Sequence, residues 1–289
     1  MRSPQIPREG QASSHHARAD PDAAIQSMSQ TQLSLIRARA PLIHNITNYV
    51  VMNSTANALL AIGASPVMAH AVEEIEEMAR LAQALVLNIG TLSASWIDAM
   101  AKAARVASEQ GIPIVLDPVG CGATAYRTRA ARDLVAAARP SVIRGNASEV
   151  RALARSVGGT KGVDSLHTPE EAMEDAVALS RSLDCAVSVS GPTDIVVDGD
   201  RVARIHNGDP LMTRVTGMGC TASAITGAFL AVEADRFEAA VQAMVTMGVA
   251  GELAAAGAAG PGSFQVRFLD TLHGLDDADL GLKARLTRG

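Results

Sequence analysis

Short continuous runs of apolar residues, each followed by a glycine or a polar residue, recur along this chain and constrain its fold more than any other feature. One run covers residues 84–89, and another covers residues 112–116 and ends at Asp117. A run of this length without polar alternation is typical of a strand that is buried on both faces of a sheet. Because both faces must then be covered by helices, the chain is expected to fold as an α/β protein.

Segments of helical character alternate with the strands. Strands are expected at residues 42–46, 65–68, 84–90, 112–120, 141–146 and 185–191, with a hairpin of residues 194–197 and 202–206. Helices are expected at residues 27–38, 47–62, 73–82, 93–110, 127–138, 148–157, 168–183, 221–234, 237–256 and 264–275. Thr47 or Asn48 is expected to cap the second helix, and Gly63 and Gly111 to end helices. This alternation predicts a mostly parallel sheet with helices on both faces.

Residues 27–289 are expected to form a single domain, because no linker, repeat or break in composition interrupts residues 27–279. Residues 1–26 are polar and rich in Pro, Ser, Arg and His, and they are predicted to be a disordered N-terminal extension. No apolar stretch follows Arg2, which argues against a secretory signal.

Composition excludes several classes of partner. A net charge of −5 and an aromatic content of 2% argue against binding to nucleic acid. The most apolar stretches, residues 221–232 and 239–251, are too short for a bilayer span, so no membrane partner is expected. Three dispersed cysteines without a C-x-x-C pair argue against a disulfide framework or a structural zinc site, and they favour a cytoplasmic location.

Polar residues gather where the predicted strands end. The carboxyl edge of the sheet, where ligands bind in open α/β folds, should carry Asn45, Met68, Asn88, Asp117, Asn146, Glu149, Ser190 and Gly191. Asp117, Asn146 and Glu149 offer the hard oxygen ligands that Mg²⁺ prefers. Arg144 next to this set suits phosphate oxygens. Each residue also has a simpler interpretation. Asn146 could cap a helix, Glu149 could be an acid of its first turn, Asp117 could be a turn residue before Pro118, and Arg144 could form a surface salt bridge.

The stretch Val215-Thr216-Gly217-Met218-Gly219-Cys220-Thr221-Ala222-Ser223 places two glycines immediately before a predicted buried helix. Glycines let backbone amides approach a ligand, and a helix start attracts anions such as phosphate. Cys220 would lie at the helix start, where the pKa of a thiol tends to fall. It has no histidine partner nearby in the sequence, but it could accept a proton from a substrate hydroxyl. The alternative is a glycine-rich turn with a buried apolar cysteine.

Familiar nucleotide-binding motifs are missing from the sequence. No early strand is followed by G-x-G-x-x-G, and Gly158-Gly159-Thr160-Lys161-Gly162 lacks the glycine spacing and the Ser/Thr of a Walker A motif. The latter segment is instead expected to be a flexible loop or lid.

Six segments between about residue 41 and residue 272 occur in an order that is specific to one family. They are Leu42-Ile43-His44-Asn45-Ile46-Thr47-Asn48, Ala61-Ile62-Gly63-Ala64-Ser65-Pro66-Val67-Met68, Leu116-Asp117-Pro118-Val119, Ile143-Arg144-Gly145-Asn146-Ala147-Ser148-Glu149, Gly208-Asp209-Pro210-Leu211-Met212-Thr213 and Thr216-Gly217-Met218-Gly219-Cys220. On these residues the chain resembles the hydroxyethylthiazole kinases of thiamine biosynthesis and salvage. The resemblance covers nearly all of the predicted domain, but not the residues before 27.

The resemblance implies a ribokinase-like three-layer α/β/α sandwich and an activity. The family transfers the γ-phosphoryl group of ATP to the primary alcohol of 4-methyl-5-(2-hydroxyethyl)thiazole, with Mg²⁺ as cofactor. The site residues that it implies are Met68, Gly217 and nearby Asn45 for the thiazole, Arg144, Ser190 and Gly219 for ATP, and Asn146, Glu149 and Asp117 for Mg²⁺. Backbone amides of residues 217–220 would form the anion hole, and Cys220 would be the catalytic base or a proton relay. The family is typically a homotrimer that binds the thiazole between subunits.

Three other functions compete with this hypothesis. A ribokinase-like kinase acting on hydroxymethylpyrimidine is disfavoured by Cys220 and by the segment Asn45-Ile46-Thr47-Asn48. An NAD(P)H-hydrate dehydratase of the same fold would be expected to carry Asp where Cys220 stands. A nucleotide-binding scaffold without catalysis needs neither Cys220 nor Glu149.

Overall fold

The computed structural model describes residues 31–158 and 169–289. The predicted extension at residues 1–26, the start of the first predicted helix and the loop after Gly158 lie outside these residues. Nine strands within the described residues form one sheet in the order β2-β1-β3-β4-β5-β6-β7-β8-β9. The strands are β1 Leu42–Ile46, β2 Ser65–Val67, β3 Ala84–Asn88, β4 Ile114–Asp117, β5 Val142–Asn146, β6 Ala186–Ser190, β7 Asp194–Asp198, β8 Arg201–Ile205 and β9 Leu286–Arg288. Strands β1 to β6 are parallel, and β7, β8 and β9 extend the sheet in antiparallel fashion.

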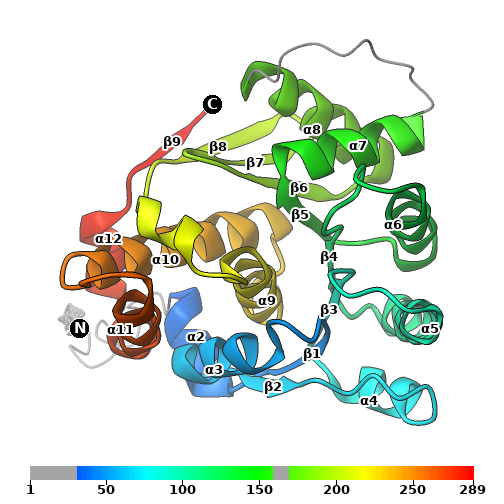
Figure 1. Cartoon of the computed structure of the whole chain (residues 1–289), viewed down its shortest axis with the longest axis horizontal. Coiled ribbons are helices and arrows are strands. Elements are labelled where there is room, and N and C mark those ends of the chain that lie inside the picture. The colour runs from blue at the N-terminus through cyan, green and yellow to red at the C-terminus, as the bar shows by residue number, and fades with distance from the viewer. Residues whose placement is uncertain (1–30, 159–168) are drawn as a thin grey trace, which may run out of the picture. The chain divides into compact units, whose positions relative to one another are not determined.

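Helices cover both faces of the sheet, as the alternation of elements predicts (Figure 1). One face packs against α2 Gln32–Arg39, α3 Met52–Ile62, α9 Met218–Leu230, α10 Arg236–Ala255 and α11 Pro261–Gly274. The other face packs against α4 Ile75–Leu81, α5 Ala94–Gln110, α6 Ala125–Ala138, α7 Ala147–Gly158 and α8 Pro169–Leu183. The architecture is therefore a three-layer α/β/α sandwich with a mostly parallel sheet.

Strand β3 shows why the apolar runs require two layers of helices. Ala84 and Val86 belong to the core under α9, whereas Leu85 and Leu87 belong to the core under α5, and all four side chains are buried. Full burial of each leucine stabilises the fold by about 1.5–3 kcal/mol relative to exposure. Both faces of this strand must therefore be covered by helices.

Helix ends agree with the sequence at some positions and differ at others. Gly63 and Gly111 end α3 and α5 in the left-handed conformation, with φ of 94° and 69°, as predicted. The predicted cap at Thr47 or Asn48 is wrong, because α3 begins only at Met52 and follows Val51 without a side-chain cap. The side-chain nitrogen of Asn48, Nδ2, instead donates a hydrogen bond to Asn88 Oδ1, 2.9 Å away on β3.

Three elements have no counterpart in the sequence-based prediction. They are the 3₁₀ helix η1 Pro210–Arg214, the short helix α12 Asp277–Lys283 and the edge strand β9. The two apolar helices near the end of the chain, α9 and α10, are core helices, as predicted. Within residues 31–158 and 169–289, none of the helices combines the length and apolar character needed to cross a bilayer.

Strand register sets the ends of neighbouring parallel strands side by side. Asn88 at the end of β3 pairs with Asp117 at the end of β4, and Asn146 at the end of β5 pairs with Ser190 at the end of β6. The carboxyl edge therefore carries two pairs of polar side chains, next to the site described below.

Candidate active site

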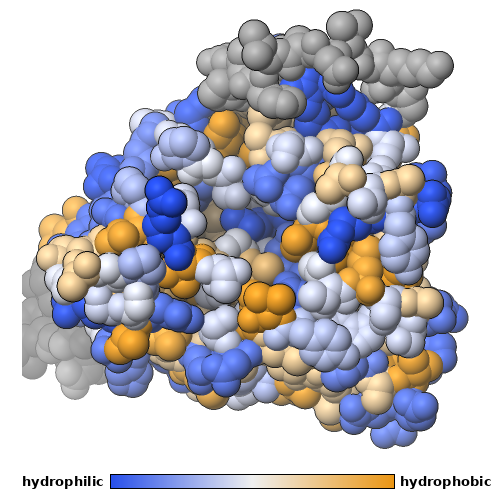
Figure 2. All heavy atoms as spheres, viewed as in Figure 1, coloured by the Kyte–Doolittle hydropathy of each residue, from blue (hydrophilic) through white to orange (hydrophobic). Residues whose placement is uncertain are grey.

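A cavity of about 740 Å³ opens at the carboxyl edge of the sheet, between the ends of β4, β5 and β6 and the start of α9. In Figure 2 the surface is hollowed near the middle of the view, where hydrophilic and hydrophobic side chains meet. Eight residues that the sequence predicts for the site line the cavity, namely Asp117, Arg144, Asn146, Glu149, Ser190, Gly217, Gly219 and Cys220. Its more distant wall is formed by residues of the η1 segment and by methionines of α10.

Asn146 and Glu149 cap the start of α7 reciprocally. Asn146 Oδ1 accepts hydrogen bonds from the Glu149 amide at 3.0 Å and from Ser148 Oγ at 2.7 Å. Glu149 Oε2 accepts from the Asn146 amide at 2.9 Å, and its Oε1 accepts from the Gly120 amide at 2.8 Å. This is the capping-box arrangement. It confirms the simpler interpretation of both residues, while the carboxylate of Glu149 still faces the cavity.

Asp117 is the most deeply buried carboxylate of the site. Its Oδ2 accepts hydrogen bonds from Ser223 Oγ at 2.7 Å and from Asn88 Nδ2 at 2.8 Å. Burial raises the pKa of Asp117 to about 6, although the positive charge of Arg144 opposes the shift. None of the described residues is hydrogen-bonded to Oδ1. Asp117 is among the residues that line the cavity.

Cys220 lies in the first turn of α9 and is joined to Asp117 through two asparagines. Asn48 Nδ2 donates to Cys220 Sγ at 3.4 Å and to Asn88 Oδ1 at 2.9 Å, and Asn88 in turn donates to Asp117. The expectation of a lowered thiol pKa is wrong. Burial and the negative charge of Asp117 raise the pKa of Cys220 to about 11.

Arg144 projects from β5 against the start of α9. Its side chain is almost fully buried, and its Nε has no hydrogen-bond acceptor among the described residues. A Cβ atom added to Gly219 would lie 2.6 Å from Nη1, so the missing side chain at Gly219 makes room for the guanidinium. A buried cation with an unused donor beside an open cavity is suited to an anionic ligand.

Gly217 is the residue before the first turn of α9. Its φ of 85° favours glycine, and an added Cβ would collide with Val51. No side chain caps this helix, so its first amides are directed at the cavity without a side-chain acceptor. The helix therefore presents backbone donors and the positive end of its dipole to an anion.

Met68 and Asn45 do not belong to the residues that line the cavity. Asn45 is fully buried in β1, and its Nδ2 donates to the carbonyl of Ile43 at 3.0 Å. Met68 follows β2, and its carbonyl oxygen lies 3.1 Å from His70 Nδ1. The structure thus separates two of the three residues predicted for the thiazole, Met68 and Asn45, from those predicted for ATP, and the role of these two residues stays a prediction.

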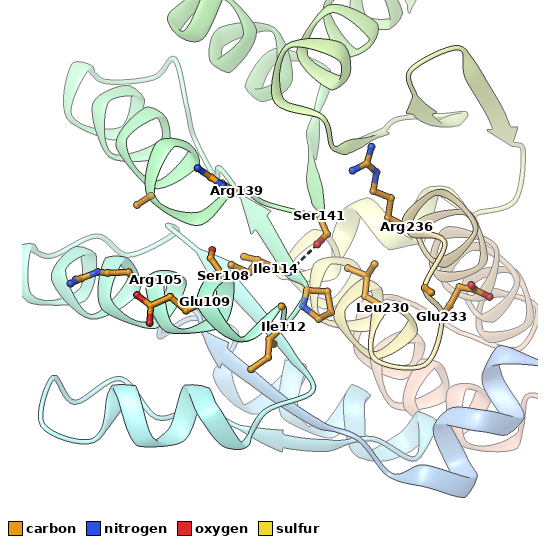
Figure 3. Close-up of a pocket in the computed structure, with 14 residues that line it drawn as sticks. Arg105, Ser108, Glu109, Ile112, Ile114, Arg139, Ser141, Leu230, Glu233 and Arg236 are labelled. Atoms are coloured by element: carbon orange, nitrogen blue, oxygen red, sulfur yellow. Dashed lines mark hydrogen bonds between the residues drawn. The ribbon is translucent and has the colours of Figure 1, made fainter.

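A second cavity, of about 700 Å³, lies at the opposite edge of the sheet (Figure 3). It is bordered by Arg105, Arg139 and Arg236, but Arg236 is already paired with Asp184 and Asp198. The carboxyl-terminal ends of α5, α6 and α9 lie around it, and their dipoles oppose an anion. None of the residues predicted for the site lines this second cavity, so we place the chemistry in the first cavity.

Several residues of the site have no role in the sequence-based prediction. Sequence patterns predict Asn48 as a helix cap, Ser223 as part of an apolar helix and Asn88 only as a residue of the sheet edge. The segment Gly208-Asp209-Pro210-Leu211-Met212-Thr213 contributes to the resemblance without a stated role, and most of it lines the cavity. Among these residues, only that segment carries a sequence signal for the site, namely its match to the family. The other contacts join residues far apart in the chain, so no local pattern reveals them.

Solved structures of kinases share the three-layer fold of this chain. Pyridoxal kinases share its fold; that of Bacillus subtilis, solved with ADP, superposes with a TM-score of 0.53 at 18% identity over 71% of this chain and 88% of the other. The model of the hydroxyethylthiazole kinase family matches residues 33–278. The chain therefore belongs to the hydroxyethylthiazole kinase family.

Similar proteins agree with this family assignment. The hydroxyethylthiazole kinase of Syntrophus aciditrophicus is 57% identical over 88% of this chain and 94% of its own length. That of Leptospira biflexa is 56% identical over 84% of this chain and 91% of its own length. The solved hydroxyethylthiazole kinase from Pyrococcus horikoshii has a TM-score of 0.83 at 46% identity, over 89% of this chain and 97% of that chain.

Proposed function

We propose that this protein transfers the γ-phosphoryl group of ATP to the primary alcohol of 4-methyl-5-(2-hydroxyethyl)thiazole, giving the thiazole phosphate for thiamine biosynthesis or salvage. The family match over residues 33–278 carries this proposal. The cavity supports it, because an anion-binding helix start, a buried arginine and two carboxylates face one space.

The start of α9 and Arg144 bind the phosphoryl group during transfer. Phosphoryl transfer depends mainly on positioning and charge neutralisation, which backbone amides and a guanidinium supply. The amides of residues 217–220 form the anion hole, and Arg144 adds a full positive charge beside Gly219. Ser190, whose Oγ lies 3.5 Å from the Gly145 carbonyl oxygen, borders the same space and contacts ATP.

Two carboxylates would hold a magnesium ion. The described residues contain no cluster of three or more His, Cys, Asp or Glu side chains arranged for a metal. Magnesium, however, commonly uses one or two carboxylates together with phosphate oxygens and water. Asp117 Oδ1 and the Glu149 carboxylate fit that pattern, and bound Mg²⁺ would neutralise charge on the phosphates. Asn146 contributes by holding Glu149, because its Oδ1 already accepts two hydrogen bonds.

Cys220 contacts the substrate hydroxyl in this proposal, but it is not a strong base. With a pKa of about 11 the thiol is almost entirely protonated at neutral pH. It acts as a proton relay near the reacting oxygen, held by Asn48 at 3.4 Å. The anion hole accounts for more of the rate, since the transition state requires little general-base assistance.

The thiazole site is completed by a homotrimer. Met68 and Gly217 line the thiazole with Asn45 nearby, although the single chain brings only Gly217 to the cavity. Exposed apolar side chains at Tyr49 and Val50, each 64% exposed, follow β1 and would be covered by a neighbouring subunit.

An enzyme that draws on ATP and keeps its three cysteines as free thiols fits a cytoplasmic location.

Release of ADP tests the activity. We expect ADP to form when ATP, Mg²⁺ and the thiazole alcohol are all present, and very little to form with hydroxymethylpyrimidine or without an alcohol. Equal ADP release with and without the thiazole alcohol would refute the kinase assignment. Light scattering of the purified protein should give the mass of three chains, and a monomer with full activity would refute the shared thiazole site.

A further inference from the structure

Arg127 bonds to the two segments that follow strands β3 and β4, next to the active site. It belongs to the first turns of α6, and its guanidinium is partly buried. Nη1 donates to the carbonyls of Ile89, at 2.8 Å, and Val119, at 2.9 Å. Nη2 donates to the carbonyl of Gly90 at 2.8 Å. One side chain therefore joins the segment after β3 to the segment after β4.

The peptide group between Val119 and Gly120 transmits this contact to Glu149. Its carbonyl accepts from Arg127, and its N–H donates to Glu149 Oε1 at 2.8 Å. A charge-assisted bond to a carbonyl polarises the amide and strengthens its N–H as a donor. Gly120 adopts a φ of 71°, which favours glycine, and an added Cβ would lie 3.0 Å from Arg127 Cδ. The orientation of this peptide is thus fixed from both sides.

A second peptide group makes the same connection to Asp117. The carbonyl of Ile89 accepts from Arg127, and the N–H of Gly90, in the same peptide, donates to Asn88 Oδ1 at 3.0 Å. Asn88 then donates through Nδ2 to Asp117 Oδ2 at 2.8 Å. The arginine is therefore linked by short hydrogen-bonded chains to both carboxylates that face the cavity.

We propose that Arg127 is a positioning residue of this active site. It fixes the orientation of the carboxylates of Glu149 and Asp117 through the two peptide groups Val119–Gly120 and Ile89–Gly90. This inference rests on the proposed function, since the two carboxylates are the groups assigned to the magnesium ion that accompanies ATP. Arg127 is not among the residues that line the cavity and does not contact substrate. Its effect is expected in magnesium-dependent nucleotide binding and not in binding of the thiazole alcohol.

Calorimetric titration with ADP, with and without Mg²⁺, measures this effect independently of turnover. In Arg127→Met, the gain in ADP affinity that Mg²⁺ gives to the wild type should shrink on the order of five- to thirty-fold, while ADP binding without Mg²⁺ and the KM for the thiazole alcohol stay close to wild type. Arg127→Lys keeps the positive charge but lacks the forked guanidinium, so its magnesium-dependent gain in ADP affinity should lie between those of the wild type and Arg127→Met. Arg129→Met, at an exposed position on the same helix, is the matched control and should behave as wild type.

A double-mutant cycle with Glu149→Gln separates positioning from general loss of stability. If Arg127 acts through Glu149, the second substitution adds little to the first. Additive effects, or a magnesium gain in Arg127→Met equal to that of the wild type, would overturn the inference. A variant that is merely less stable would lower the melting temperature and leave the magnesium gain unchanged. If the proposed function itself is wrong, the wild type will show no magnesium-dependent ADP binding.

Discussion

The contact between Gly219 and Arg144 allows catalysis to be reduced with little effect on the fold. Gly219 is the second residue of α9, and its φ lies outside the left-handed region. Alanine at this helical position is more favourable than glycine by up to about 1 kcal/mol. The added Cβ would, however, lie 2.6 Å from Arg144 Nη1, 3.5 Å from Cζ and 3.6 Å from Nη2. The flexible end of Arg144 must therefore move away from the anion site.

The loss can be scaled from the bond that Arg144 makes to phosphate. A hydrogen bond from a charged group contributes about 1.5–3 kcal/mol, and each 1.4 kcal/mol corresponds to about tenfold in rate. We expect Gly219→Ala to lower kcat/KM for ATP by roughly 10- to 150-fold, with a melting temperature at or slightly above that of the wild type.

A coupled ADP-release assay and a thermal melt measure these two quantities. The matched control is Gly262→Ala, which also changes the second residue of a helix, α11, but has nothing within 4 Å of the added Cβ. Wild-type kcat/KM in Gly219→Ala, or an equal loss in both variants, would refute the role of Arg144 at the start of α9.

Three further predictions concern other parts of the site. Gly217→Val should lower kcat more than Cys220→Ala does, because Gly217→Val disturbs the anion hole, whereas Cys220→Ala removes only the proton relay. A larger loss of kcat in Cys220→Ala in steady-state assays would contradict this ranking. Because the pKa of Asp117 is raised to about 6 in the folded protein, the unfolded state binds fewer protons than the folded state between about pH 4 and pH 6. As the pH rises through that range, the ligand-free wild type should therefore lose stability relative to Asp117→Asn. A difference in melting temperature that does not depend on pH would contradict the raised pKa of Asp117. Glu252 accepts from the Gly208 amide at 2.7 Å and from Arg285 Nη2 at 2.6 Å, so Glu252→Ala should cost about 1–3 kcal/mol in chemical denaturation and raise the KM for ATP; unchanged values would show that this wall of the cavity does not depend on Glu252.

Local sequence signals predicted the layers and eight of the residues that line the cavity. The apolar runs at residues 84–89 and 112–116 required burial on two faces, and β3 and β4 have it. Asn146 and Glu149, three residues apart, form the capping box that their spacing suggests. Gly111 ends α5, as its place in the sequence predicts, and Ser93 caps the start of that helix by accepting from the Trp96 amide at 3.3 Å. In each case the deciding contact lies within a few residues of the chain.

Contacts between distant segments account for what the sequence did not predict. Asn48 looks like a helix cap, but its partners are 40 and 172 residues away, at Asn88 and Cys220. The pKa of Cys220 was expected to fall at a helix start, yet burial and Asp117 raise it. Arg127 carries no local pattern at all, because its acceptors come from the loops after two other strands.

The last segment of the chain was missed for the same reason. Strand β9 has only three residues, Leu286–Arg288, and it is defined by antiparallel pairing with β8. Arg285, just before it, is bonded to Glu252 of α10, which lies next to the cavity wall. A three-residue strand gives no periodic signal that a sequence pattern can detect.

The central claim is that this site moves a phosphoryl group from ATP to the thiazole alcohol. The most direct test is mass spectrometry of the reaction mixture, with ADP and the thiazole product measured together. We predict that thiazole phosphate appears in a one-to-one ratio with ADP, and that Gly219→Ala slows both equally. Formation of ADP without thiazole phosphate would contradict the account.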